Sequence, residues 1–124
     1  KRHDRIVVCS DSMRGAGMKD GPSILGPKKN GTAVIIEDGI AKMPDRSCFA
    51  GSVATGERLF NTLYKTMSLG VVEASRLLSL QPASTIGMDG DVGSIEVGKK
   101  ADLLIINEEG KIEKIYKEGV EIKR

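Results

Sequence analysis

An apolar run near the start of the chain constrains the fold more than any other feature. Residues 6–10 (IVVCS) lead without a break into Asp11, and residues 12–22 then contain three glycines. A run with no polar face predicts a strand buried on both sides, which is typical of parallel sheets covered by helices. Asp11 would then lie at the carboxyl end of that strand, at the start of an irregular loop.

The position of Asp11 makes it a candidate catalytic residue, because barrel enzymes carry their catalytic groups at the carboxyl ends of their strands. Asp is also a common cap of helices and turns, so spacing alone leaves a purely structural role open. The loop that follows lacks the Gly-x-x-x-x-Gly-Lys-Ser/Thr pattern, so it does not match a phosphate-cradling motif.

Short strands and helices are predicted in the middle of the chain. Residues 23–26 predict at most a short strand, and residues 32–43 predict a hairpin around the Asp38-Gly39 turn. Pro82 can open a short helix that Gly87 closes. Before it, two apolar stripes at helical spacing predict two further helices. The first stripe comprises Leu59, Phe60, Leu63, Tyr64 and Met67, and the second Val71, Ala74, Leu77 and Leu78.

The last third of the chain predicts a small antiparallel meander. Its strands are expected over residues 93–98, 101–107, 111–117 and 120–123, with turns at the intervening glycines. The parallel neighbours that a doubly buried strand at residues 6–10 would need are missing from this inventory. We therefore expect the chain to be the C-terminal piece of a larger barrel protein.

Composition gives little support for several classes of partner. The chain has 19 basic and 17 acidic residues and 3% aromatic residues, which gives little support for nucleic-acid binding. No apolar run in the sequence approaches the roughly 20 residues that span a bilayer, so no membrane-embedded segment is expected, and neither is a secretory leader. Cys9 and Cys48 form no disulfide framework, so reduced thiols and a cytoplasmic location are expected. His3 is expected to be solvated, and it has no companion at metal-ligand spacing.

Three segments carry a resemblance to a known family. The segment SDSM at residues 10–13, with glycines at 15 and 17, resembles the last barrel strand and loop of the N-acetylglucosamine-6-phosphate deacetylase family. The segment FAGS at residues 49–52 is similar to that family's substrate loop ahead of the final barrel helix. The tail, from Pro82 to ADL at residues 101–103, resembles metal-dependent amidohydrolases in general.

The resemblance implies a fold. The chain would be an α/β fragment, the C-terminal part of a (β/α)8 TIM-like barrel with a small antiparallel β-sandwich segment. Residues 1–90 would supply the last strand, an inserted hairpin and the helices of the barrel. Residues 91–124 would supply C-terminal strands of the sandwich.

The resemblance also implies a chemistry. The parent would hydrolyse N-acetylglucosamine 6-phosphate to glucosamine 6-phosphate and acetate, using a divalent metal (zinc or iron) that activates water. The aspartate matching Asp11 would be the general acid/base, and Phe49, Ala50 and Gly51 would line the sugar site. The metal ligands and phosphate-binding residues would precede Lys1, so the chain alone is expected to hold no metal and to be inactive. The parent is expected to be a homodimer that acts on a small amino-sugar phosphate, without nucleic-acid or membrane partners.

Two alternatives remain open at this point. The first is a sister enzyme such as an N-acetylgalactosamine-6-phosphate deacetylase. The second is a free-standing α+β interaction module with no enzymatic activity.

Overall fold

The computed structural model describes residues 5–123, which fall into two compact units. The hairpin unit comprises Ser10–Gly56. The helix–meander unit comprises Glu57–Arg124 together with Lys1–Cys9, of which residues 5–9 and 57–123 are described.

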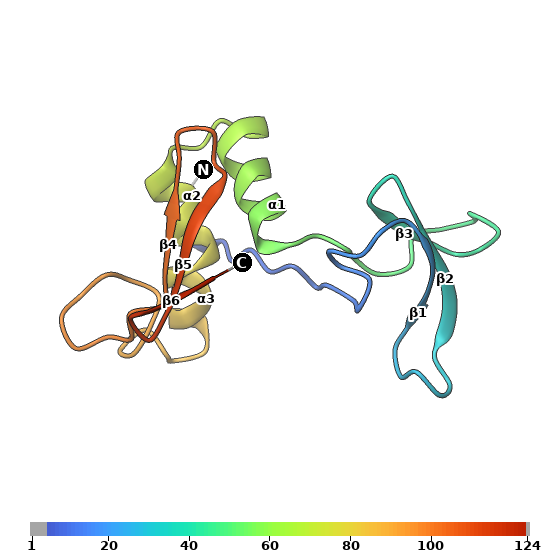
Figure 1. Cartoon of the computed structure of the whole chain (residues 1–124), viewed down its shortest axis with the longest axis horizontal. Helices are drawn as coiled ribbons and strands as arrows, with labels where there is room; N and C mark the ends of the chain where they lie inside the picture. The colour runs from blue at the N-terminus through green and yellow to red at the C-terminus, as the bar shows by residue number, and fades with distance from the viewer. Residues whose placement is uncertain (1–4, 124) are drawn as a thin grey trace. The chain divides into compact units, whose positions relative to one another are not determined.

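A three-stranded antiparallel sheet forms the hairpin unit. Its strands are β1 (Gly21–Leu25), β2 (Thr32–Glu37) and β3 (Ile40–Lys42), in the order β1-β2-β3 (Figure 1). Asp38 and Gly39 have φ angles of 54° and 67°, as a two-residue type I′ turn requires. The predicted hairpin is therefore confirmed. The short strand predicted at residues 23–26 is β1, which begins two residues earlier and pairs with β2.

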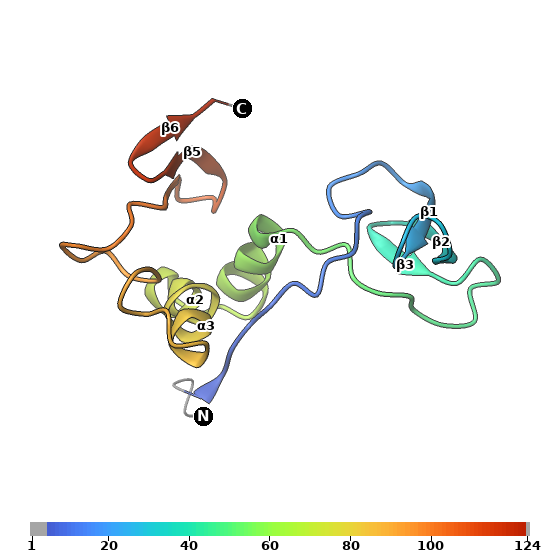
Figure 2. The same cartoon turned by 90° about the horizontal axis from the view of Figure 1, so that it is seen from below.

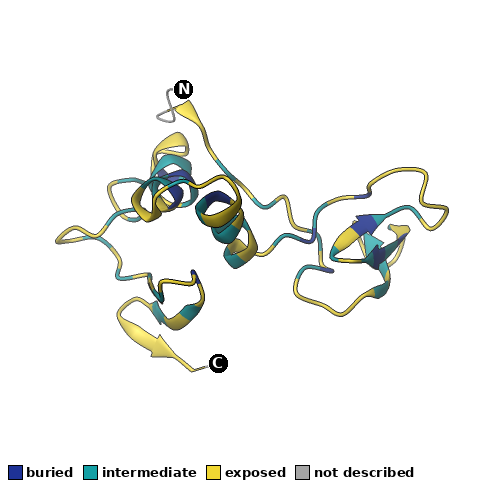
Figure 3. Ribbon diagram, turned by 90° about the horizontal axis from the view of Figure 1, so that it is seen from above, coloured by how far each residue is buried: buried dark blue, intermediate teal, exposed yellow. Residues whose placement is uncertain are grey.

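The core of the hairpin unit lies against this sheet. Ile36, Ala41 and Val53 form a buried cluster, and Met13 packs on it from the loop after Asp11. Figure 3 colours the buried parts of the ribbon dark blue. The side chain of Met13 thus links that loop to the sheet. This contact anchors the start of the loop at residues 12–22 on the buried cluster.

The strand predicted at residues 6–10 is wrong for this chain, because these residues form no strand. Ile6 and Val7 are 40% and 43% exposed. The described backbone contact in this run is from Val8 N–H to the Leu77 carbonyl, at 3.1 Å. An apolar run becomes a buried strand only where parallel neighbours supply backbone partners, and residues 5–123 contain no such strand beside it.

The first predicted helix consists of α1 (Gly56–Asn61) followed by a π-helical turn, η2 (Thr62–Thr66). Leu63 is buried, and the rings of Phe60 and Tyr64 stack at 5.5 Å between centroids. Met67 was expected on the same stripe but is 60% exposed. The cause is the wider turn: Met67 N–H bonds to the Thr62 carbonyl, which breaks the 3.6-residue period.

Two helices follow, α2 (Val71–Leu78) and α3 (Leu80–Thr85) (Figure 2). Ala74 and Leu77 are buried as predicted. Val71, the first residue of α2, was predicted to face inward but is 46% exposed. Pro82 does not open α3 but is its third residue, a first-turn position that tolerates proline.

The predicted end of this helix at Gly87 is confirmed. Gly87 has a φ of 70° and donates to the Ser84 carbonyl, and Met88 N–H donates to the Ala83 carbonyl at 2.8 Å. These two bonds define a Schellman motif, which glycine favours because it adopts positive φ without strain. The helix therefore ends where the sequence predicts.

The tail forms a second antiparallel sheet, with strands β4 (Leu103–Ile106), β5 (Ile112–Lys117) and β6 (Val120–Ile122) in that order (Figure 1). The strand predicted at residues 93–98 is wrong. Gly93 and Gly98 both have a φ of 94°, and Lys99 Nζ bonds back to Ser94 Oγ at 2.6 Å, so this segment curls into a loop.

The meander is anchored to the first helix by polar contacts. Asn61 Nδ2 donates to the Gly110 carbonyl at 3.1 Å, and Tyr64 donates its hydroxyl hydrogen to the Glu108 carbonyl at 3.3 Å. Helices and meander therefore belong to one unit. The assignment of residues 1–90 to a barrel and 91–124 to a sandwich stays a prediction.

Residues 5–123 include no helix with the length and apolar character needed to cross a membrane.

Candidate active site

Asp11 and Gly51, which are far apart in the sequence, line one open pocket of the hairpin unit. The pocket has a volume of about 330 Å³. Its lining residues are Asp11, Ser12, Met13, Arg14, Leu25, Gly26 and Gly51. The predicted acid/base is thus brought beside one of the three predicted substrate contacts.

Backbone contacts just beyond Asp11 fix its position. Ser12 forms a parallel bridge with Ser52, and Met13 N–H donates to the Ser52 carbonyl at 2.9 Å. The hydroxyl of Ser12 also donates to the Ala54 carbonyl. The segment after Asp11 is therefore held alongside the segment after Gly51 by contacts from two consecutive residues.

Asp11 itself is exposed and has a φ of 46°, in the left-handed region that few non-glycine residues adopt. Asp is one of the residues that tolerates this conformation. Within residues 5–123, its carboxylate caps no helix or turn amide. A carboxylate in an open pocket can accept a proton from a bound reactant and return it.

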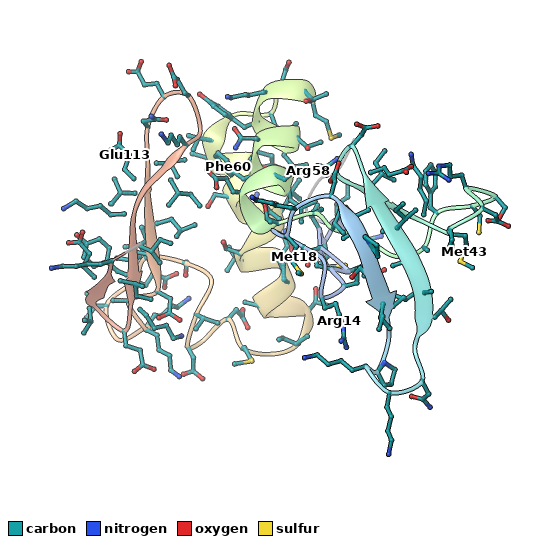
Figure 4. The ribbon with its side chains drawn as sticks, turned by 45° about the vertical axis from the view of Figure 1, so that its right-hand side comes forward. Arg14, Met18, Met43, Arg58, Phe60 and Glu113 are labelled. Carbon is teal, nitrogen blue, oxygen red and sulfur yellow. The ribbon has the colours of Figure 1, made fainter. Side chains whose placement is uncertain are left out.

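Arg14 also lines the pocket, although no sequence pattern predicts a role for it. Its Nη2 donates to the Gly26 carbonyl at 2.7 Å, which ties the loop after Asp11 to the end of β1 (Figure 4). A single cation in a glycine-rich loop carries no spacing signal, so only the fold reveals this contact.

The three predicted substrate contacts have different surroundings. Gly51 lines the Asp11 pocket, with a φ of 85°. Ala50 is buried, and its N–H donates to the Ala41 carbonyl at 3.0 Å. Phe49 is 76% exposed and lines a second pocket of about 430 Å³. The other residues of that second pocket are Lys42, Arg46, Ser47 and Cys48.

Carboxylates near the second pocket are held in their charged form. A hydrogen bond from the Arg46 guanidinium, with the charges of Arg46 and Lys42, keeps the pKa of Glu37 below its usual value. Hydrogen bonds from the hydroxyl and backbone N–H of Ser47 similarly lower the pKa of Asp45. Both groups therefore remain ionised at neutral pH.

The described residues do not fit a metal centre by themselves. Within residues 5–123, no three His, Cys, Asp or Glu side chains converge. Cys9 and Cys48 are exposed free thiols, and His3 lies outside the described residues. We therefore assign no metal-dependent step to these residues, and the absence of bound metal in the isolated chain stays a prediction.

Comparison with known proteins shows the family to which the chain belongs. The model of the amidohydrolase family matches residues 3–122, nearly the whole chain. The chain belongs to the amidohydrolase family.

Two of the relatives that the chain matches are named as deacetylases of amino-sugar phosphates. The N-acetylglucosamine-6-phosphate deacetylase of Vibrio furnissii is 30% identical over 115 residues, which are 93% of this chain and 28% of that protein. The putative N-acetylgalactosamine-6-phosphate deacetylase of Escherichia coli K12 is 28% identical over 116 residues, with 94% of this chain and 66% of that protein covered. The resemblance predicted from the sequence is confirmed.

The crystal structure of N-acetylglucosamine-6-phosphate deacetylase from Thermotoga maritima matches all of this chain. The TM-score is 0.84 at 29% identity, and the match covers 32% of that structure. The chain thus spans about a third of the solved relative and 28% of the Vibrio furnissii protein. The predicted fold class, a C-terminal part of a (β/α)8 barrel with a β-sandwich segment, is confirmed.

Proposed function

We propose that the protein containing this chain hydrolyses the N-acetyl group of N-acetylglucosamine 6-phosphate, giving glucosamine 6-phosphate and acetate. The pocket lined by both Asp11 and Gly51 carries the proposal. A substrate bound there would lie beside a carboxylate that can transfer a proton and beside a backbone segment that has no side chain. Relatives named as deacetylases of amino-sugar phosphates support it.

In this proposal, Asp11 is the general acid/base. Water adds its oxygen to the acetyl carbon and loses a proton to the carboxylate, which then donates that proton to the leaving nitrogen as the C–N bond breaks. Water is consumed, acetate and the protonated amine are formed, and the Asp11 carboxylate is regenerated. A positioned group of this kind accelerates proton transfer by about 10²- to 10⁴-fold.

Residues 49–51 are proposed to contact the sugar in two ways. At Gly51 the backbone lies on the pocket wall without a side chain, so a substrate can approach its polar groups closely. The N–H of Ala50 donates to the Ala41 carbonyl of β3, and Ala50 contributes to the sugar site through its backbone. Phe49 presents an exposed aromatic ring, which can pack on an apolar face of the sugar.

We further propose that the whole protein uses a divalent cation, zinc or iron, held by ligands outside residues 5–123. The isolated chain is then inactive. We place the whole protein in the cytoplasm as a homodimer, with a small amino-sugar phosphate as its partner.

A second candidate substrate is N-acetylgalactosamine 6-phosphate. The Escherichia coli relative named for that sugar covers 94% of this chain at 28% identity, close to the values for the Vibrio furnissii protein. Membership of an enzyme family leaves the non-enzymatic module without an observation in its favour.

The test is acetate release by the full-length protein from the two amino-sugar phosphates, with the 124-residue chain assayed in parallel. We expect a higher kcat/KM with N-acetylglucosamine 6-phosphate and no turnover by the isolated chain. A preference for the galactosamine compound would select the second candidate. Failure to release acetate from either compound would refute the proposal.

A further inference from the structure

The loop at residues 43–49, which follows β3, is closed at its base by backbone hydrogen bonds. Met43 N–H donates to the Cys48 carbonyl at 2.9 Å (Met43 is labelled in Figure 4). One step beyond the loop, Ala50 N–H donates to the Ala41 carbonyl at 3.0 Å. Hydrogen exchange at these two amides therefore measures whether the hydrogen bonds at the base of the loop are intact.

Arg46 at the tip of this loop adopts an unfavourable backbone conformation. Its φ is 61°, in the region that glycine occupies readily and that other side chains rarely adopt. A conformation of this kind persists only where surrounding contacts enforce it. The contacts of the Arg46 side chain are therefore informative.

Those contacts form a clamp from the loop to β2. Arg46 Nε donates to Glu37 Oε2 at 3.1 Å, and Nη2 donates to Oε1 at 2.5 Å. The third nitrogen, Nη1, donates to the Pro44 carbonyl at 3.1 Å. All three guanidinium nitrogens thus have partners, and two of them bind one carboxylate in the fork geometry that fixes orientation.

An exposed ion pair by itself stabilises a protein little. Here the carboxylate of Glu37 is only 28% exposed and is shared with Lys42, whose Nζ lies 3.7 Å from Oε2. Two cations around one carboxylate form a network with defined geometry. Such a network can restrain a loop more than a single pair does.

We propose that the Glu37–Arg46 clamp positions Phe49 for substrate binding. Arg46 and Phe49 line the same pocket, and the loop that the clamp restrains ends at Phe49, which is bridged to Lys42 of β3. Glu37 does not line that pocket, so it acts through Arg46. This inference rests on the proposed function, because it makes Glu37 and Arg46 positioning residues for that substrate.

The experiment uses the full-length protein with Arg46→Ala and Glu37→Gln. We expect either change to raise the KM for N-acetylglucosamine 6-phosphate about 3- to 10-fold and to alter kcat less than about twofold, as loss of uniform binding does. Hydrogen exchange at the amides of Met43 and Ala50 should accelerate in both variants. The matched control is Glu121→Gln, which removes an exposed ion pair to Lys114 in the other unit and should change neither readout.

Arg46→Gly separates the clamp from backbone strain. Glycine accepts a φ of 61° freely but cannot bind Glu37. We expect the glycine variant to resemble Arg46→Ala in KM and in amide exchange. Wild-type KM and exchange in the glycine variant would overturn the clamp. Exchange is measured without substrate, so it tests the clamp even if the unmodified protein releases no acetate and the proposed function fails.

Discussion

Ser12 and Ser52 form a parallel bridge that sets the backbone after Asp11 beside the backbone after Gly51. The bridge joins SDSM and FAGS, two of the three segments that carry the resemblance, although neither segment forms a regular strand. Asp11, the proposed general acid/base, and Gly51, one of the three proposed substrate contacts, therefore line one pocket.

Replacing Asp11 by Asn should abolish proton transfer and leave the fold intact. Asn tolerates a φ of 46° about as well as Asp, so no backbone strain is added. We expect kcat of the full-length protein to fall by about 10²- to 10⁴-fold, the usual contribution of a general acid/base. Asp91→Asn, at an exposed position in the helix–meander unit, is the control and should keep wild-type kcat. A variant of Asp11 that retains most of the activity would remove Asp11 from the mechanism.

Replacing Gly15 by Ala should destabilise the hairpin unit. Gly15 is buried, and a Cβ added there would overlap Cδ1 of Ile36 and lie 3.5 Å from Cε of Met13. Overpacking of this kind destabilises by about 1–3 kcal/mol. Urea denaturation should show a lower midpoint for Gly15→Ala and almost no change for Gly90→Ala, where an added Cβ meets nothing within 4 Å. Equal midpoints for the two variants would contradict this packing.

The elements that sequence predicted well are those determined by neighbouring residues. The Asp38-Gly39 turn fixes its hairpin, and Gly87 ends its helix, because each requires only a local positive φ. The run at residues 6–10 depends on strands that residues 5–123 do not contain, so its apolar pattern misled the prediction. The pairing of Arg46 with Glu37 was not predicted. It depends on the conformation of the loop after β3, and no sequence spacing indicates that conformation.

The Glu37–Arg46 pair should make stability depend on acid pH. The Arg46 hydrogen bond holds the pKa of Glu37 below its ordinary value of 4.5 in the folded state. The contribution of the pair is therefore fully present above pH 4.5 and is lost as the pH falls through the lower, folded-state pKa. We expect wild type to have a higher urea midpoint than Glu37→Gln at pH 7, and the difference to narrow toward pH 3. A difference independent of pH would show that the charge of Glu37 does not contribute.

Asn61 and Gly110 should be energetically coupled, because they hold the β4–β5 turn on the first helix. Asn61 Nδ2 donates to the carbonyls of Glu57 and Gly110, at 2.9 and 3.1 Å. Truncating Asn61 to Ala leaves the carbonyl of buried Gly110 without this donor, at a cost of about 1–3 kcal/mol. A Cβ on Gly110 would overlap Oδ1 of Asn61, so Gly110→Ala should also destabilise by itself.

The double variant separates overlap from backbone strain at Gly110. Without the Asn61 amide the added Cβ has room, so Gly110→Ala should destabilise less in the Asn61→Ala background, with a coupling of about 0.5–3 kcal/mol. Gly98→Ala is the matched control: its φ of 94° is also in the left-handed region, but an added Cβ meets nothing within 4 Å. It should destabilise through strain alone and add independently to Asn61→Ala. Additive effects of Asn61→Ala and Gly110→Ala would mean that this contact does not hold the meander on the helix.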